Sequence, residues 1–498
     1  MLAAVAVFAV VGIGLLLQSS AAIMTSQEEA ESGVLAGNAG AGDPAGASGG
    51  ASVKFGRAPL AALPDPGNYN TTVDFATAIT QLDTYSLGST VSGYGTAWAA
   101  GQGGQCANIQ CTNMRKLGLG SYRVSIQYNG GNPVSGAGGN GVGGVLGDQL
   151  VDAIKAASAE PILVVGGKGG QNDMDFTDAD AKGLVQHYST GKYAGNNAVK
   201  FYVVGNEPSN GGNGNMSIAA FCAKFNSSAA AMKQANPNIK LVGPAWPYYD
   251  IDVIKSFLQC AGDKVDIIDY HAYGQSSQDV DQNIQGSAAL YEQQNKEVRA
   301  AVNQLVPARA GQIAQQVGEY NVSPFASSDT NDARFYTAGN TVWNAIATGS
   351  ILKGGGRAFI FADQNNPIGL IFQAGDIASL YGRVQGDPQP AYHGIGMFSG
   401  EGLFRRFGQT MVQATSTDPD IVAYASNNAK SLVLINKNRD AMRTASVRLM
   451  GAGVSAAAVW QTDKSRPFDY PTNKGGYAVS GGFAYTLPPY SVTTMTFD

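Results

Sequence analysis

The stretch Lys200-Phe-Tyr-Val-Val-Gly-Asn-Glu-Pro-Ser209 decides how the rest of this chain of 498 residues is interpreted. Its apolar run, Phe201–Val204, is short and has no polar face, which is typical of a parallel strand buried on both sides. Glu207 follows at the carboxyl end of this strand. A second segment, Val317-Gly-Glu-Tyr-Asn321, ends on Glu319 in the same manner. Parallel strands expose side chains to ligands at their carboxyl ends, so both glutamates are candidate functional residues.

The alternation of strand and helix patterns on either side of Lys200–Ser209 predicts a (β/α)8 barrel, the α/β fold called a TIM barrel. From about Leu82 onward, eight β-branched or apolar runs alternate with helical patterns. The expected strands are Ser86–Gly95, Ser121–Gln127, Pro161–Gly166, Lys200–Asn206, Lys240–Ala245, Val265–His271, Gln312–Glu319 and Ala358–Asp363. Expected helices include Asp148–Ser158, Ala219–Ala235, Gln278–Leu305 and Asn331–Thr348. A doubly wound sheet is the rival fold, but no GxGxxG motif opens a helix after the first strand.

The barrel is expected over residues 81–386, and other segments flank it. From about Asp387 the helical pattern stops and short β-runs separated by Gly, Pro and Asn predict a C-terminal β-sandwich over residues 387–498. Residues 26–80 are rich in Gly and Ala and are interpreted as a linker and lead-in. Residues 1–25 contain the apolar run Leu2–Leu17, which is either a signal peptide or a membrane anchor.

Composition limits the partners. The chain has 32 Lys and Arg against 37 Asp and Glu, and no basic run supplies the surface that nucleic-acid binding needs. A neutral substrate therefore fits better. With three histidines and no Cys/His cluster, we expect neither a metal nor a cofactor.

The four cysteines suit an oxidising compartment, so we expect a secreted or extracytoplasmic membrane-anchored protein. Cys106 and Cys111 are close enough to close a small loop, which would leave Cys222 and Cys260 to pair. Three pairings are possible in principle.

Two carboxylates at one barrel mouth match the chemistry of glycosidic bond cleavage. That reaction needs one protonated acid for the leaving oxygen and a second carboxylate that attacks the anomeric carbon or activates water. We therefore expect Glu207 and Glu319 to share one site.

The motifs Gly-Asn-Glu-Pro at residues 205–208 and Gly-Glu-Tyr-Asn at residues 318–321 resemble those of clan A glycoside hydrolases. With the trailing β-sandwich, the chain looks most similar to family 39 and its neighbour family 79. The resemblance implies a retaining reaction with Glu207 as acid/base and Glu319 as nucleophile. It also implies that Asn206 binds the sugar 2-hydroxyl and that Arg123 orients the nucleophile. Glu207 would start protonated, so we expect burial and the charge of Glu319 to raise its pKa.

Further residues are candidates for substrate binding. His271 and Tyr273 alternate along the sixth strand, so their side chains lie on the same face. Trp246, after the fifth strand, is either a sugar-stacking platform or part of the packing beneath its loop. Strand eight lacks the tryptophan common in this clan, so Phe361 or Asp363 would take its place.

These features predict a retaining glycoside hydrolase that cleaves β-glycosidic bonds of an oligo- or polysaccharide. The alternative is a non-catalytic carbohydrate-binding or polysaccharide-assembly protein on the same scaffold. Such a protein would keep aromatic platforms but would need neither Glu207 nor Glu319, whose presence favours the enzyme.

Overall fold

The computed structural model describes residues 39–42, 52–55, 60–91, 106, 108–127, 134–135, 147–166, 174–274, 284, 286–324, 332–364, 367–451 and 453–498. The chain divides into two compact units, Met1–Ala61 and Ala62–Asp498. In the first unit, β1 (Ala39–Gly42) pairs antiparallel with β2 (Ser52–Phe55). The expected signal peptide or anchor at 1–25 lies outside the described residues. Among the helices that are described, none is both long and apolar enough to span a bilayer.

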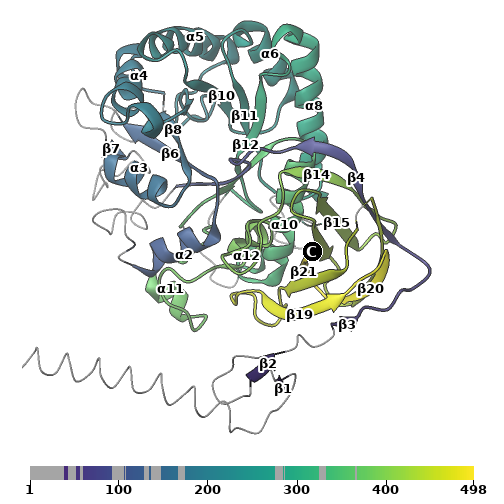
Figure 1. Cartoon of the computed structure of the whole chain (residues 1–498). Coiled ribbons are helices and arrows are strands. Elements are labelled where there is room, and N and C mark those ends of the chain that lie inside the picture. The colour runs from purple at the N-terminus through teal and green to yellow at the C-terminus, as the bar shows by residue number, and fades with distance from the viewer. Residues whose placement is uncertain are drawn as a thin grey trace, which may run out of the picture. The chain divides into compact units, whose positions relative to one another are not determined.

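The second unit contains a closed parallel barrel of eight strands, as the sequence predicts (Figure 1). The strands are β5 (Leu87–Thr90), β6 (Ser121–Gln127), β8 (Glu160–Gly166), β9 (Phe201–Val203), β10 (Lys240–Trp246), β11 (Ile267–His271), β12 (Ala314–Tyr320) and β13 (Arg357–Phe361). Each pairs in parallel with the next, and the pairing of β13 with β5 closes the barrel. The two-residue β7 (Val134–Ser135) adds an antiparallel partner to β6.

Helices follow the strands around the outside of the barrel (Figure 1). They are α2 (Ile109–Leu117), α3 (Gly147–Ala156), α4 (Asp178–Val185), α5 (Ile218–Ala235), α6 (Ile251–Ala261), α8 (Leu290–Leu305), α9 (Ala333–Tyr336), α10 (Ala338–Lys353), α11 (Gly375–Ser379) and α12 (Pro390–Ser399). Short turns of helix lie at η3 (Gln186–Thr190), η4 (Gly195–Asn197) and η5 (Pro307–Arg309). Capping side chains start several helices; for example, Asp250 accepts from the backbone N–H groups of Asp252 and Val253.

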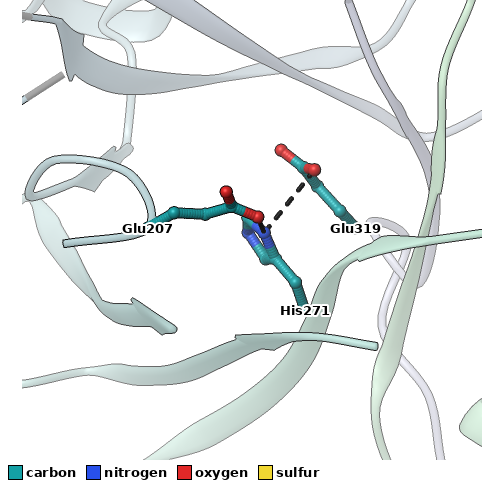
Figure 2. A group of neighbouring side chains, drawn as sticks. All are labelled: Glu207, His271 and Glu319. Carbon is teal, nitrogen blue, oxygen red and sulfur yellow. Dashed lines mark hydrogen bonds and ion pairs between the residues drawn. The ribbon is translucent and has the colours of Figure 1, made fainter. Parts of the chain in front are cut away.

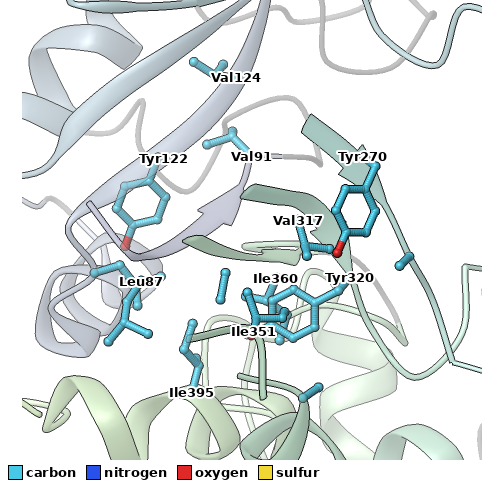
Figure 3. Packing of buried hydrophobic residues seen from close by; sticks show 14 of the residues in the cluster. Leu87, Val91, Tyr122, Val124, Tyr270, Val317, Tyr320, Ile351, Ile360 and Ile395 are labelled. Carbon is cyan, nitrogen blue, oxygen red and sulfur yellow. The ribbon is translucent and has the colours of Figure 1, made fainter. Parts of the chain in front are cut away.

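Strand residues alternate between two cores. Ile162, Val164 and Phe201 belong to the small cluster inside the barrel, whereas Leu163 and Tyr202 face the helices. Because both faces are buried, strands such as β8 and β9 are apolar runs without a polar face. Figure 3 shows part of the outer core, where strand residues such as Leu87 and Val317 pack with Ile351 of α10 and Ile395 of α12.

A ten-stranded mixed sheet forms the β-rich region. Its order is β20 (Gly482–Leu487), β17 (Arg443–Met450), β4 (Thr71–Gln81), β14 (Thr410–Ser416), β15 (Ile421–Ser426), β16 (Ser431–Asn436), β21 (Ser491–Phe497), β18 (Ala456–Gln461), β19 (Thr472–Ala478) and β3 (Ala61–Ala62). Phe497 meets both Phe75 and Phe483, with ring centroids 6.1 and 6.4 Å apart. Residues from strands far apart in this order therefore share one core, which gives the expected β-sandwich.

Two elements differ from the sequence-based expectation. Thr71–Gln81, assigned to the lead-in, is strand β4, paired antiparallel with β14 and parallel with β17. Its inward residues Val73 and Phe75 are fully buried. The second difference is α12, which lies within 387–498 and is buried along its whole length as the helix after strand eight. Pro390 at its first turn and Gly400 at its end bound this helix. Every face of the helix is buried, so its sequence has no amphipathic period.

Both cysteine pairs favoured by the sequence form disulfides, Cys106–Cys111 and Cys222–Cys260. The second bond connects α5 to α6.

Candidate active site

Four barrel strands bring their carboxyl ends together around one cluster of charged side chains. Arg123 comes from β6, Glu207 follows β9, His271 ends β11 and Glu319 lies near the end of β12. Figure 2 shows Glu207 and Glu319 pointing toward each other with His271 between them. One side-chain nitrogen or oxygen atom from each of these three residues lies within 4.8 Å of the other two.

A tight turn after β9 positions Glu207. Gly205 and Glu207 both have positive φ, +76° and +44°, and the Glu207 backbone N–H donates to the Ala245 carbonyl over 3.0 Å. A Cβ at Gly205 would lie 2.2 Å from Met174 Sδ, so glycine is needed there on two counts. The Glu207 carboxylate accepts from His271 Nδ1 (2.8 Å) and from Asn210 Nδ2 (2.9 Å). The sequence alone does not identify Asn210, since its role depends on this turn.

A β-bulge directs Glu319 into the barrel. Asp269 and Tyr270 of β11 pair with Gln316 and Val317, but the next residue, His271, pairs with Glu319. Gly318 is thus an extra residue on β12, and it shifts Glu319 onto the same face as His271. Only the three-dimensional pairing reveals this shift.

Two donors hold the Glu319 carboxylate. Arg123 Nη1 lies 2.7 Å from Oε1, and the Tyr273 hydroxyl donates to Oε2 over 2.7 Å. The site is well shielded, because Arg123 is 2 % exposed and Glu319 6 % exposed. Charge-assisted hydrogen bonds of this kind restrict the orientation of the carboxylate.

The Arg123 guanidinium connects the cluster. Besides Glu319, its Nη2 donates to Asn206 Oδ1 and lies 3.3 Å from His271 Nε2. The structure therefore brings together Asn206, Arg123, His271 and Tyr273 around the two glutamates. His271 and Tyr273 contact the carboxylates themselves.

The pKa of Glu207 lies below its usual value, which corrects the expectation of a raised one. Burial raises this pKa, but hydrogen bonding and charge from His271, with Asn210 and Arg123, outweigh the effect. For His271, burial lowers the pKa, yet the charge of Glu319 and the hydrogen bond to Glu207 bring it above 6.5. The two residues thus act as a coupled pair that holds its proton on the histidine side.

Glu207, His271 and Glu319 offer three donor atoms at a spacing that a metal ion accepts. However, the Arg123 cation lies 2.7 Å from one of these carboxylates. Its charge disfavours a second cation, so we interpret the cluster as an acid/base site.

Two further candidates for substrate binding, Trp246 and Asp363, are buried. Trp246 is 4 % exposed, which fits the packing role considered for it, and its contact with a sugar stays a prediction. Asp363 is fully buried and accepts from the backbone N–H of Gln364. Phe361 is partly exposed instead, and its ring lies 6.3 Å from that of Tyr273, next to Glu319. Of the two residues considered for strand eight, Phe361 lies next to Tyr273. The substrate contact of Asp363 stays a prediction.

Comparison with known proteins finds solved structures of similar fold. No protein-family model matches the sequence, and no curated protein matches it. Solved structures share its fold over 86 % of this chain. An α-L-arabinofuranosidase from Thermotoga maritima is similar at a TM-score of 0.66 and 16 % identity over 99 % of its own chain. A family 51 α-L-arabinofuranosidase from Thermotoga petrophila gives 0.65 and 17 % over 100 %. A family 44 xyloglucanase from Paenibacillus polymyxa gives 0.61 and 14 % over 99 %.

Proposed function

We propose that this protein is a retaining glycoside hydrolase of the clan A type, with Glu207 as acid/base and Glu319 as nucleophile. The observation that carries the proposal is the spacing of the carboxylates, which offer oxygens within 4.8 Å of each other. Retaining enzymes hold their two carboxyl groups about 5–5.5 Å apart, whereas inverting enzymes leave about 6.5–9.5 Å for a water molecule. The shared fold with glycoside hydrolases of families 51 and 44 supports the same reaction class.

In the first step, a Glu319 oxygen attacks the anomeric carbon and forms a glycosyl ester. The bond from that carbon to the leaving oxygen breaks, and the leaving oxygen takes the proton of Glu207. Arg123 and Tyr273 hold the Glu319 carboxylate aligned before the attack, so little reorganisation accompanies it.

The proton of the first step comes from the Glu207–His271 pair. His271 Nδ1 lies 2.8 Å from Glu207 Oε1, so moving the proton between them requires no rearrangement of side chains. As the bond breaks, the leaving oxygen gains basicity and draws the proton onto and then off Glu207. The pair must therefore hold one proton when substrate binds.

In the second step, water attacks the anomeric carbon of the ester from the face that the leaving group vacated. Glu207 accepts a proton from this water, and Glu319 departs as a carboxylate. Asn206, fixed through Arg123, is the proposed partner of the sugar 2-hydroxyl.

The proposed substrate is a neutral oligo- or polysaccharide. The resemblance to families 39 and 79 favours a β-glycosidic bond, while the structures with a similar fold include α-L-arabinofuranosidases. The first panel should hence contain aryl β-D-glycosides, aryl α-L-arabinofuranosides and plant or bacterial polysaccharides. The two disulfides favour secretion, and a membrane anchor at residues 1–25 is an alternative based on sequence alone.

Alanine variants with azide test the two roles separately. We expect Glu207→Ala and Glu319→Ala each to lower kcat by about three orders of magnitude or more on the best substrate. Azide fits the space left by either carboxylate. It should give a glycosyl azide of inverted configuration with Glu319→Ala and one of retained configuration with Glu207→Ala, as read by proton NMR.

Glu292→Gln on α8 is the control, because that glutamate pairs with Lys296 and Lys353 outside the site. It should keep wild-type kcat. Azide products of the opposite configurations would reverse the two assignments. A wild-type protein that binds glycans and releases no sugar from any of them would favour the non-catalytic alternative.

A further inference from the structure

A third carboxyl group lies beneath the catalytic pair. Asp269 is on β11, two residues before His271, so its side chain is on the same face of the strand. It is fully buried. Neither the resemblance to known families nor the mechanism above uses this group.

The Asp269 side chain occupies the space beside the bulge in β12. A Cβ at Gly318 would lie only 2.2 Å from Asp269 Oδ1 and 2.7 Å from Oδ2. The carboxyl group therefore packs directly against the residue that precedes Glu319. Any larger residue at position 318 would displace it.

Within the described part of the chain, neither oxygen of Asp269 makes a hydrogen bond of good geometry. The same holds for both amide atoms of Gln316, the residue paired with Asp269 in the barrel, and for Arg123 Nε. An ionised carboxylate in a buried site is normally paired or hydrogen-bonded, because the loss of its hydration is otherwise uncompensated.

Charge balance points the same way. The cluster already contains two carboxylates, Glu207 and Glu319, against the Arg123 guanidinium and the His271 imidazole. An ionised Asp269 would make three neighbouring anions against at most two cations. It would also compete for the guanidinium that holds Glu319.

We propose that Asp269 is a third carboxyl group of the active site and is held as the neutral acid. As a positioning residue, it then does not compete for the Arg123 guanidinium, which stays bound to Glu319 and Asn206. A neutral carboxyl group matches the Gln316 amide, since each side then offers one donor and one acceptor. Burial raises the pKa of Asp269, and Glu319 adds to this effect, while Arg123, His271 and the nearby Gln316 amide oppose it. The role of Asp269 deepens the proposed function, whereas its protonation can be measured without any substrate.

Infrared spectroscopy on the full chain labelled with ¹³C at the aspartate side-chain carboxyl group tests the protonation directly. The label excludes Glu207 and Glu319. At pH 7 we expect one band from a protonated carboxylic acid, absent from Asp269→Asn and still present in Asp266→Asn. Asp266 is the control because it precedes the same strand and pairs with Lys233 and Arg309. Absence of the band from the wild-type protein at pH 7 would overturn the proposal.

Histidine NMR gives a second readout, since the chain has only three histidines. Replacing a neutral acid by the isosteric amide adds no charge, so Asp269→Asn should change the His271 pKa by less than about 0.3. Glu319→Gln removes a nearby negative charge and should lower that pKa by about one unit. A comparable fall in Asp269→Asn would show an ionised Asp269 and contradict the proposal. If Asp269→Asn does not fold, the wild-type infrared band decides alone. Neither measurement depends on whether the protein hydrolyses glycosides.

Discussion

The properties of the two glutamates of the site depend on their hydrogen-bond partners. Glu207 accepts from His271 Nδ1, and Glu319 accepts from Arg123 and Tyr273. These contacts reverse the expected direction of the Glu207 pKa. The acid that the reaction needs is therefore the Glu207–His271 pair, and its proton is lost only when the histidine is titrated.

The pH dependence of activity follows from this pairing. The His271 pKa is raised above 6.5, so the pair keeps its proton up to that raised value and loses it as the pH rises further. We expect kcat/KM to fall on the alkaline side with an apparent pKa above 6.5. His271→Asn should lower kcat by about tenfold to a hundredfold and shift the alkaline limb by at least about half a pH unit.

His187→Asn is the matched control, because His187 pairs with Asp148 outside the cluster of charged residues. Its pH profile should coincide with that of the wild type. An alkaline limb that is identical in His271→Asn would separate His271 from the proton of Glu207.

Strands and helices place these side chains by local rules that are largely visible in the sequence. The runs at Ser121–Gln127 and Lys240–Ala245 were predicted as strands, and they form β6 and β10 with nearly the same bounds. The bulge at Gly318 was not predictable, because a bulge is defined by the neighbouring strand. Likewise, the alternation of Val73 and Phe75 indicates a strand but does not identify its partners.

The disulfide between α5 and α6 offers a test of how elements contribute to stability. Cys222 and Cys260 are 38 residues apart in sequence, and Cys106 and Cys111 are 5 apart. If loop closure in the unfolded chain dominates, a double Ser substitution that removes Cys222–Cys260 lowers the free energy of unfolding by about 4 kcal/mol. Removal of Cys106–Cys111 lowers it by about 2 kcal/mol. Urea unfolding of both variants measures the difference. Equal losses would show that the effect arises in the folded state.

The molecule as a whole depends on β4, which joins the sheet of the β-rich region from the far end of the sequence. It lies between β14 and β17 and covers part of the apolar core. A chain segment before the barrel thus completes a domain after it.

A fragment comparison tests this dependence. Residues 408–498 alone lack β4, so β14 and β17 lose their shared partner and the core exposes the place of Phe75. We expect this fragment to show no cooperative thermal transition by circular dichroism. The same fragment with residues 60–82 fused at its N-terminus should regain one. A cooperative transition in the fragment without β4 would mean that the remaining strands suffice.

The sequence by itself determined the features that depend on local order along the chain. Eight apolar runs between helical patterns specify a barrel. A glutamate at the carboxyl end of one of these strands therefore lies at the mouth of the barrel. Glu207 and Glu319 were identifiable for this reason.

Only the tertiary structure decided which groups surround those glutamates and how they are charged. Trp246 and Asp363 are buried, Asn210 and Asp269 join the site, and β4 belongs to the second sheet. Each of these features depends on residues that are distant in sequence, or on a turn whose geometry such residues determine. Burial and charge are sums over spatial neighbours, and the linear order of residues does not specify those neighbours.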